Sequence, residues 1–214
     1  MSRPTFPTLP ALLSLAVLLL AAMPAAAGPP AATPLLLAAQ PQEPDTPPPT
    51  RSSRASGVER ILDQVLPKFG HRNWIVVADS AYPSQARQGI TTVYLGGDQL
   101  ATVRAVLGAA DAAEHVQPII HVDAELKHVP EADAPGIDAY RRDLARLLGD
   151  RERRTEPHEK IIEKLDRAAE TFHVLIFKTD MTLPYTTVFL ELDCGYWGAE
   201  KEARLRAAIE AAEK

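Results

Sequence analysis

The sequence predicts an α/β fold, with a mixed, mainly parallel sheet flanked by helices and a disordered N-terminal extension. Three observations predict it. Short runs rich in β-branched residues alternate with longer segments whose apolar residues recur at helical spacing. Residues 74–78 include no polar residue, which is typical of a strand buried on both faces. Twelve of the nineteen prolines lie in the first 56 residues, so the sheet and its helices are expected after them.

The first 27 residues have the three-part pattern of a secretory signal peptide. Arg3 is the only charged side chain before Glu43, residues 11–22 form an apolar run, and three alanines end at Ala27. We therefore expect cleavage after Ala27 and a periplasmic or secreted protein that does not contact the membrane afterwards. The apolar run is short for a membrane span, and a retained membrane anchor is the alternative interpretation.

The proline- and alanine-rich residues 28–56 are typical of an extended linker that cannot bury a core. The folded domain is then expected over residues 57–197, followed by a C-terminal helix over 198–214. Cys194 is the only cysteine, so no intrachain disulfide stabilises the domain. The net charge is −5 and the basic residues are interspersed with acidic ones, so nucleic acid is not an expected partner.

The domain is predicted to begin with a helix over Val58–Phe69, because its apolar residues recur on one face. Pro67 fits poorly inside a helix, so the helix is expected to fray or end there, before Gly70. The buried strand described above comes next. A short strand over residues 91–95 ends at two glycines, and Asp98 is the expected N-cap of the following helix.

The second half of the domain continues the alternation of strands and helices. The expected elements are a strand at 116–122, a helix at 137–148, a helix from Thr155 to about Phe172, strands at 173–177 and 187–192, and a helix at 199–214. The last segment is rich in Ala, Glu, Lys and Arg, which are good helix formers.

Two candidate site residues flank the buried strand. His71 lies in the turn before it, and Asp79 follows its carboxyl end. Ligands of open α/β sheets bind in the crevice outside the carboxyl ends of the strands. The alternative is that Asp79 only caps the turn that follows and His71 is a solvated turn residue.

Two later segments add polar side chains. His158 is expected near the start of a helix capped by Thr155, where the helix dipole disfavours imidazolium and keeps a histidine neutral. Tyr185, Thr186 and Thr187 form a polar turn before the last strand. An exposed first-turn histidine and ordinary strand-edge residues are the alternative interpretations.

One strand carries three side chains of metal-ligand type. His121, Asp123 and Glu125 share one face of the predicted strand, and His, Asp and Glu can bind a divalent ion together. Three ligands spaced along one strand lie too far apart for one ion unless another segment helps, with His115 or His128 the nearest candidates. A polar edge or interface face is the favoured interpretation, and no metal is predicted.

The segment from Phe69 to Pro83 resembles the RbsD/FucU family of sugar mutarotases. Its pattern is a helix that ends in Gly-His, an apolar strand, and then Asp before a turn with proline. The chain has Gly70-His71, the apolar run 74–78, Asp79 and Pro83 at that spacing. Later motifs of the family are similar to residues 119–125, a strand that runs into an acidic segment, to His158 and to Tyr185-Thr186-Thr187, and they come in the same order.

The resemblance implies an activity and roles for these residues. Mutarotases interconvert the ring forms or anomers of a free monosaccharide by general acid–base catalysis without a cofactor. By resemblance His71 is the proton donor, and Asp79, His158, Tyr185, Thr186 and Thr187 bind the sugar. Family members form ring-like oligomers with sites near subunit boundaries, so a homo-oligomer is implied here too.

Two features depart from the family. Thr187 stands where the family usually has asparagine, and the predicted signal peptide differs from the cytoplasmic location of familiar members. A non-catalytic module that binds a sugar or small polyol in the same pocket is therefore the alternative function.

Overall fold

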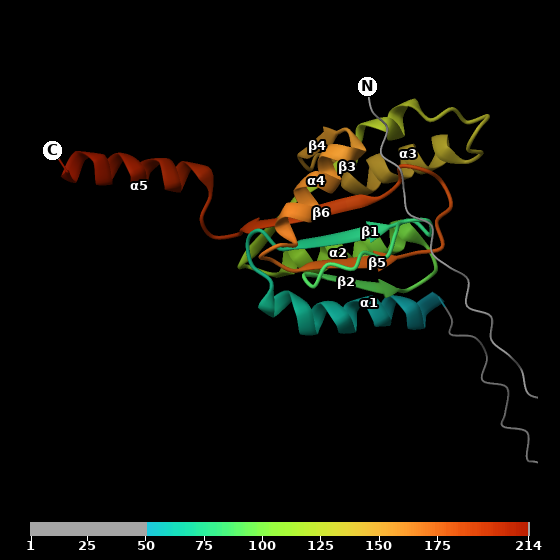
Figure 1. Ribbon diagram of the computed structural model, residues 1–214, viewed down its shortest axis with the longest axis horizontal. Helices are drawn as coiled ribbons and strands as arrows, with labels where there is room; N and C mark the ends of the chain where they lie inside the picture. The colour runs from blue at the N-terminus through green and yellow to red at the C-terminus, as the bar shows by residue number, and fades with distance from the viewer. Residues whose placement is uncertain (1–50, 214) are drawn as a thin grey trace, which may run out of the picture. The chain divides into compact units, whose positions relative to one another are not determined.

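The computed structural model describes residues 51–213, and of residues 51–56 only the backbone. The predicted signal peptide, its cleavage after Ala27 and residues 28–50 of the predicted linker lie outside the described residues. The elements in chain order are α1 (Arg51–Val65), a 3-10 turn (Leu66–Lys68), β1 (Trp74–Ala78), β2 (Ile90–Tyr94), α2 (Gln99–Ala112), β3 (Val116–Asp123), a second 3-10 turn (Ala124–His128), α3 (Ile137–Leu148), β4 (Arg153–Glu156), α4 (His158–Ala168), β5 (Val174–Lys178), β6 (Val188–Cys194) and α5 (Ala199–Ala212) (Figure 1).

The strands form one six-stranded sheet in the order β2-β5-β1-β6-β3-β4. The pairs β1–β5, β2–β5 and β3–β4 are parallel, and β6 is antiparallel to both of its neighbours, β1 and β3. The predicted mixed, mainly parallel sheet is therefore confirmed. All five residues of β1 are buried, as its unbroken apolar sequence predicts for a central strand.

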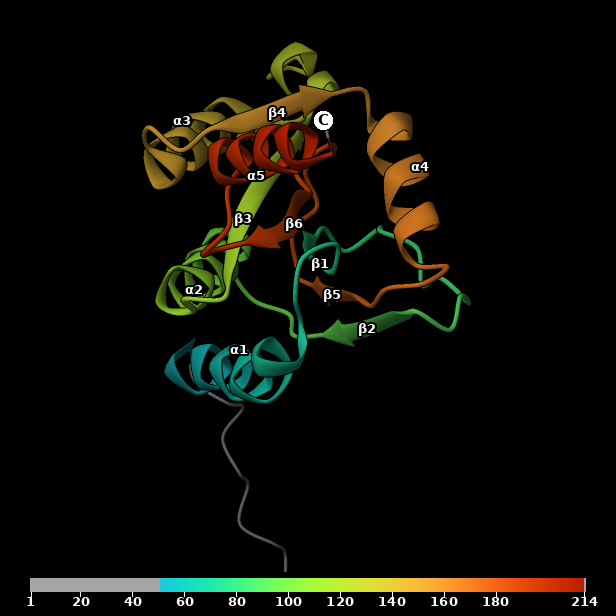
Figure 2. The same ribbon diagram turned by 90° about the vertical axis from the view of Figure 1, so that its left-hand side faces the viewer.

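Helices cover both faces of the sheet. Apolar residues of α1, α2 and α3 pack on one face and form the larger core, which includes Leu62, Val103 and Leu144. On the other face α4 forms a smaller core through Ile161 and Leu165. Figure 2 shows α4 on the opposite side of the sheet from α1 and α2. The face under α4 therefore has fewer helices over it, and both polar clusters described below lie there.

The structure differs from the predicted elements at two places. The helix expected from Val58 begins at Arg51, where no apolar repeat marks it; its α-helical part ends at Val65, and Pro67 lies in the 3-10 turn. The helix expected from Thr155 was wrong at its start, because Thr155 belongs to β4 and the helix begins at His158. Strand β4 lies at the sheet edge with three of its four residues exposed, so it has no apolar alternation to reveal it.

The C-terminal helix α5 agrees with the prediction within two residues at its end. None of its residues is buried, so packing on the domain is not what makes it helical; its composition of strong helix formers accounts for it. None of the helices within residues 51–213 has both the length and the apolar character that a bilayer span requires.

Candidate functional site

The candidate site lies where β1 and β3 end and β6 begins. Val188, the first residue of β6, pairs with Val77 of β1 on one side and with Val122 of β3 on the other. The residues just beyond these pairs therefore meet at one edge of the sheet. Asp79 comes from β1, Asp123 from β3, and Thr187 precedes β6.

Asp79 joins β1 to the turn before β6. Its Oδ2 accepts a hydrogen bond of 3.1 Å from the Thr187 hydroxyl, and its Oδ1 accepts one of 2.9 Å from the Ala81 amide. Asp79 thus caps the turn that follows β1, which was the alternative interpretation of this residue. It also lies at the end of the sheet where β6 begins. Because Thr187 is buried at 2% exposure, its hydroxyl fixes the carboxylate rather than lying free in solvent.

The buried Asp123 and the partly exposed His158 form an acid–base pair. Asp123 Oδ1 lies 3.1 Å from His158 Nδ1, and Asp123 is 2% exposed. Burial raises the pKa of the Asp123 carboxyl, although the hydrogen bond from His158 opposes this. The hydrogen bond to Asp123 in turn raises the pKa of the His158 imidazole. The pair therefore holds a proton more tightly than either group would in water.

The expectation that a helix N-terminus would keep His158 neutral was wrong. His158 is the first residue of α4, but a carboxylate already occupies this helix end, since both oxygens of Glu125 accept from the His158 amide at 3.1 and 3.0 Å. Asp123 and Glu125 thus face the imidazole and its backbone. Their negative charges favour imidazolium and outweigh the helix dipole.

Tyr185 supplies an aromatic wall beside His158. Its ring stands edge-on to the imidazole, with 5.9 Å between the ring centroids, and the residue is 41% exposed. Its φ of 55° places it in the left-handed region, which is costly for a residue with a Cβ. Backbone strain of this kind is concentrated at active sites and ligand-binding sites.

Thr186 has a different place from its neighbours. Its hydroxyl donates to the Leu183 carbonyl at 2.8 Å, and its own carbonyl accepts from Gln99 at 2.9 Å and from Tyr140 at 2.7 Å. These bonds hold the turn that carries Tyr185 and Thr187, so within the chain Thr186 positions its two neighbours and is itself buried.

His71 lies at the opposite end of the strands from the candidate site. It precedes β1, whereas Asp79 follows it, and the five residues of β1 alone span roughly 16 Å. Its neighbour Arg72 donates a 2.7 Å backbone hydrogen bond to Leu192, near the end of β6 that is remote from Thr187. One chain therefore brings together Asp79, His158, Tyr185 and Thr187, and leaves His71 apart from them.

The sequence did not single out Tyr82, whose ring packs below the site. Tyr82 and His158 both contact Phe189, with centroid distances of 6.4 Å each. Among the described residues, the buried Tyr82 hydroxyl and the buried Asp123 Oδ2 each have no hydrogen-bond partner. Burial, and then nearby carboxylates that include Asp123, raise the pKa of the Tyr82 hydroxyl, which stays protonated. An unpaired donor and an unpaired acceptor thus border the same site.

The residues weighed as metal ligands have separate partners. Asp123 pairs with His158, Glu125 caps α4, and His121 lies between Glu156 and Glu191. Within residues 51–213, no group of three or more His, Cys, Asp or Glu side chains has the geometry to hold a metal ion.

No protein-family model and no curated protein matches the sequence. Among solved structures, Bacillus subtilis RbsD complexed with D-ribose is similar at 20% identity and a TM-score of 0.45, with 62% of this chain and 91% of that chain covered. The fucose mutarotase from Streptococcus pneumoniae in complex with L-fucose has 21% identity and a TM-score of 0.42, with 62% of this chain and 91% of that chain covered. FucU from Bifidobacterium longum has 16% identity and a TM-score of 0.44, with 63% of this chain and 94% of that chain covered. The neighbours are thus RbsD and FucU proteins, and at these values they assign no ligand to this chain.

Proposed function

We propose that this protein is an exported carbohydrate mutarotase that interconverts the ring forms or anomers of a free monosaccharide. The observation that carries the proposal is the Asp123–His158 pair, set beside Asp79, Thr187 and the exposed ring of Tyr185. Carboxylates and a hydroxyl match the hydroxyl groups of a sugar, and an aromatic ring matches its apolar face. The motif that resembles RbsD and FucU points to the same substrate class.

The geometry around His158 supports a part for this residue in proton transfer. Its Nδ1 is engaged with Asp123, and no hydrogen bond within the described residues engages its Nε2. In the neutral form, the Nδ1–H donates to Asp123, so Nε2 accepts from a sugar hydroxyl. If Nε2 takes the proton of the anomeric hydroxyl, the charge of Asp123 stabilises the imidazolium that forms. The ring then opens when an acid protonates the ring oxygen, and closes by the reverse steps.

His71 is the acid that the family resemblance implies, and a second copy of the chain must supply it. Within one chain β1 separates His71 from Asp79. We therefore propose a homo-oligomer in which His71 of one copy approaches Asp79 and His158 of the next. The active site would then lie between subunits, and an isolated chain would bind sugar without turning it over.

Exchange NMR tests the activity. Saturation transfer between the anomers of D-ribose, L-fucose and other monosaccharides is measured with the wild-type protein and with His158→Gln. We expect the wild-type protein to accelerate the exchange of at least one sugar. The accelerated rate should fall by roughly 100-fold or more in His158→Gln, because a general base contributes about that much. Sugar binding without faster exchange would favour the alternative, a non-catalytic binding module. A lack of binding to every sugar would refute both.

Complementation between two variants tests the shared site. His71→Ala and Asp79→Asn are each expected to be inactive, but co-expressed chains form some sites with both wild-type residues. Mixed oligomers should therefore recover part of the wild-type exchange rate. If the mixture stays as inactive as its components while each variant is folded and oligomeric, His71 and Asp79 do not form a site between copies.

A further inference from the structure

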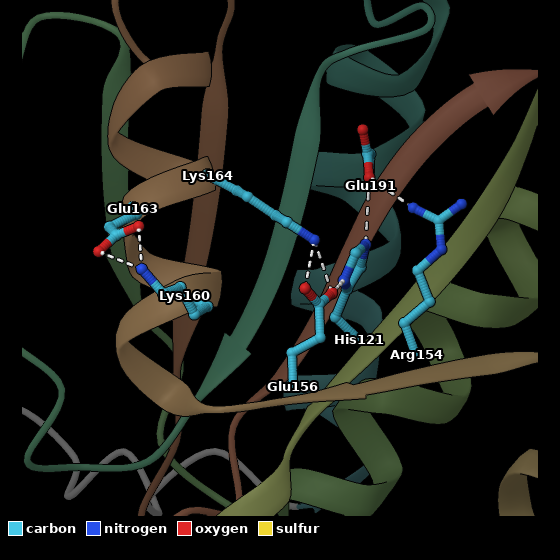
Figure 3. Close-up of polar contacts among 7 residues, drawn as sticks. All are labelled: His121, Arg154, Glu156, Lys160, Glu163, Lys164 and Glu191. Atoms are coloured by element: carbon cyan, nitrogen blue, oxygen red, sulfur yellow. Dashed lines mark hydrogen bonds and ion pairs between the residues drawn. The ribbon is translucent and has the colours of Figure 1, made fainter.

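A second polar cluster lies on the α4 face of the sheet and is centred on His121. The imidazole is fully buried, with Nδ1 at 2.9 Å from a Glu156 carboxylate oxygen and Nε2 at 3.1 Å from Glu191 (Figure 3). Carboxylates accept hydrogen bonds, and a neutral imidazole has a single N–H to donate. Both ring nitrogens of His121 therefore face carboxylate oxygens.

Two basic side chains complete this cluster. Lys164 of α4 donates to both oxygens of Glu156 at 2.6 and 2.5 Å, and Arg154 of β4 lies 3.8 Å from Glu191 (Figure 3). Lys164 and then His121 lower the pKa of the Glu156 carboxyl, and His121 and then Arg154 lower that of Glu191. Both carboxylates thus carry negative charge, and Lys164 and Arg154 offset it.

A cavity of about 450 Å³ opens beside this cluster, at the end of the sheet where β1 starts. Its wall includes one carboxylate, that of Glu191. The cationic and aromatic residues of the wall are Arg72, Arg154, Lys164, Arg167, Trp74 and Phe172. This cavity is separate from the candidate sugar site, since Trp74 and Asp79 lie at opposite ends of β1.

The two remaining arginines of the wall add uncompensated charge. Within residues 51–213, no ion pair is formed by Arg72 or Arg167. The Arg72 guanidinium lies 5.7 Å from the centre of the Phe172 ring, which orients it at the wall. The chain as a whole carries a net charge of −5, so this excess of positive charge runs against the overall balance. A cavity of this kind attracts anions.

We propose that this cavity binds a small phosphate-bearing molecule. The two unpaired guanidinium groups match the two negative charges of a phosphate monoester, and arginine donates to phosphate oxygens in pairs. The volume exceeds that of a phosphate alone, so the edge of Trp74 and Ala168 of α4 would contact the organic part of the ligand. The site is independent of the proposed sugar activity, because it shares no residue with it.

Binding is tested by NMR on the indole N–H of Trp74. The chain has two tryptophans, so Trp197, which is 41% exposed and not in the cavity wall, serves as the internal reference. Inorganic phosphate and phenyl phosphate are titrated, with acetate and chloride at matched ionic strength as comparison anions. We expect a saturable shift of the Trp74 resonance with the phosphates, while the Trp197 resonance stays in place.

Variants decide whether the arginines hold the anion. Arg72→Gln with Arg167→Gln should weaken phosphate binding by about tenfold or more, given the usual strength of charge-assisted hydrogen bonds. Arg104→Gln with Arg142→Gln removes the same charge from exposed positions of α2 and α3 and should leave it unchanged. Arg167→Gln alone gives a second test if the first pair disturbs folding, checked by circular dichroism. An equal response in all variants, an equal response to chloride, or no saturable shift would overturn the proposal.

Discussion

Asp123→Asn should make the protein's stability depend on pH in a new way. The folded-state pKa of His158 is raised above its ordinary value of 6.5, so its contribution to stability is complete below pH 6.5 and is lost as the pH rises through the folded-state pKa. The pKa of Asp123 is raised above 3.8, so its contribution is likewise lost as the pH rises. Both signs agree. The wild-type protein takes up protons on folding through this pair, and Asp123→Asn removes that uptake.

The magnitude follows from the hydrogen bond between Asp123 and His158. A charge-assisted hydrogen bond contributes about 1.5–3 kcal/mol and a neutral one about 0.5–1.5 kcal/mol. At pH 5.5 the asparagine offers an uncharged acceptor in place of the carboxylate, so the variant should lose about 1–2 kcal/mol of unfolding free energy. At pH 9 the loss should shrink toward zero or reverse, because the variant no longer buries a carboxylate with one unpaired oxygen.

Urea unfolding at pH 5.5, 7 and 9 measures this difference. Asp63→Asn is the matched control: Asp63 is exposed on α1, and its replacement should give the same small effect at every pH. NMR titration of the His158 imidazole should also show a lower pKa in Asp123→Asn than in the wild-type protein. A stability difference that does not change between pH 5.5 and 9, or an unchanged His158 pKa, would refute the coupling of this pair.

Three further substitutions test close packing and backbone conformation in the domain. Phe189→Ala removes the ring shared by Tyr82 and His158, and should lower the unfolding free energy by about 3–5 kcal/mol in urea; a loss below about 1 kcal/mol would contradict its burial. Gly89→Ala would place a Cβ 2.3 Å from the Ala169 carbonyl oxygen, so a loss of about 1–3 kcal/mol is expected, and a neutral result would be inconsistent with that contact. Tyr185→Gly relieves the left-handed backbone and should leave stability within about 1 kcal/mol of wild type while sugar binding weakens; unchanged binding would exclude this ring from the site.

The central strand and the capped helix were predictable because their signals are local. Residues 74–78 are apolar without a break, and β1 has those same bounds. Asp98 precedes an apolar helical repeat, and its side chain accepts from the Ala101 amide at 2.7 Å. Strand β4 was not predictable in the same way, since backbone pairing with β3 defines it while its side chains remain largely exposed.

The candidate site was predicted only in part, because its contacts join distant segments. Asp79 and His158 were singled out, but the partner of His158 is Asp123, 35 residues earlier, which its strand pattern marked only as a possible metal ligand. His71 and Asp79 are eight positions apart in sequence, but the extended backbone of β1 places them at opposite ends of this strand. No sequence pattern indicated that the hydroxyl of Tyr82, in the turn after β1, would be buried without a hydrogen-bond partner.

Chemical-shift mapping of a sugar titration would locate the proposed sugar site on the domain. Amide and imidazole resonances of the full domain are followed while D-ribose or L-fucose is added. We expect the largest changes at Asp79, Asp123, His158, Tyr185 and Thr187, and changes at His71 only in the oligomer. Changes confined to other surfaces, or none with any monosaccharide, would contradict a sugar site at this edge of the sheet.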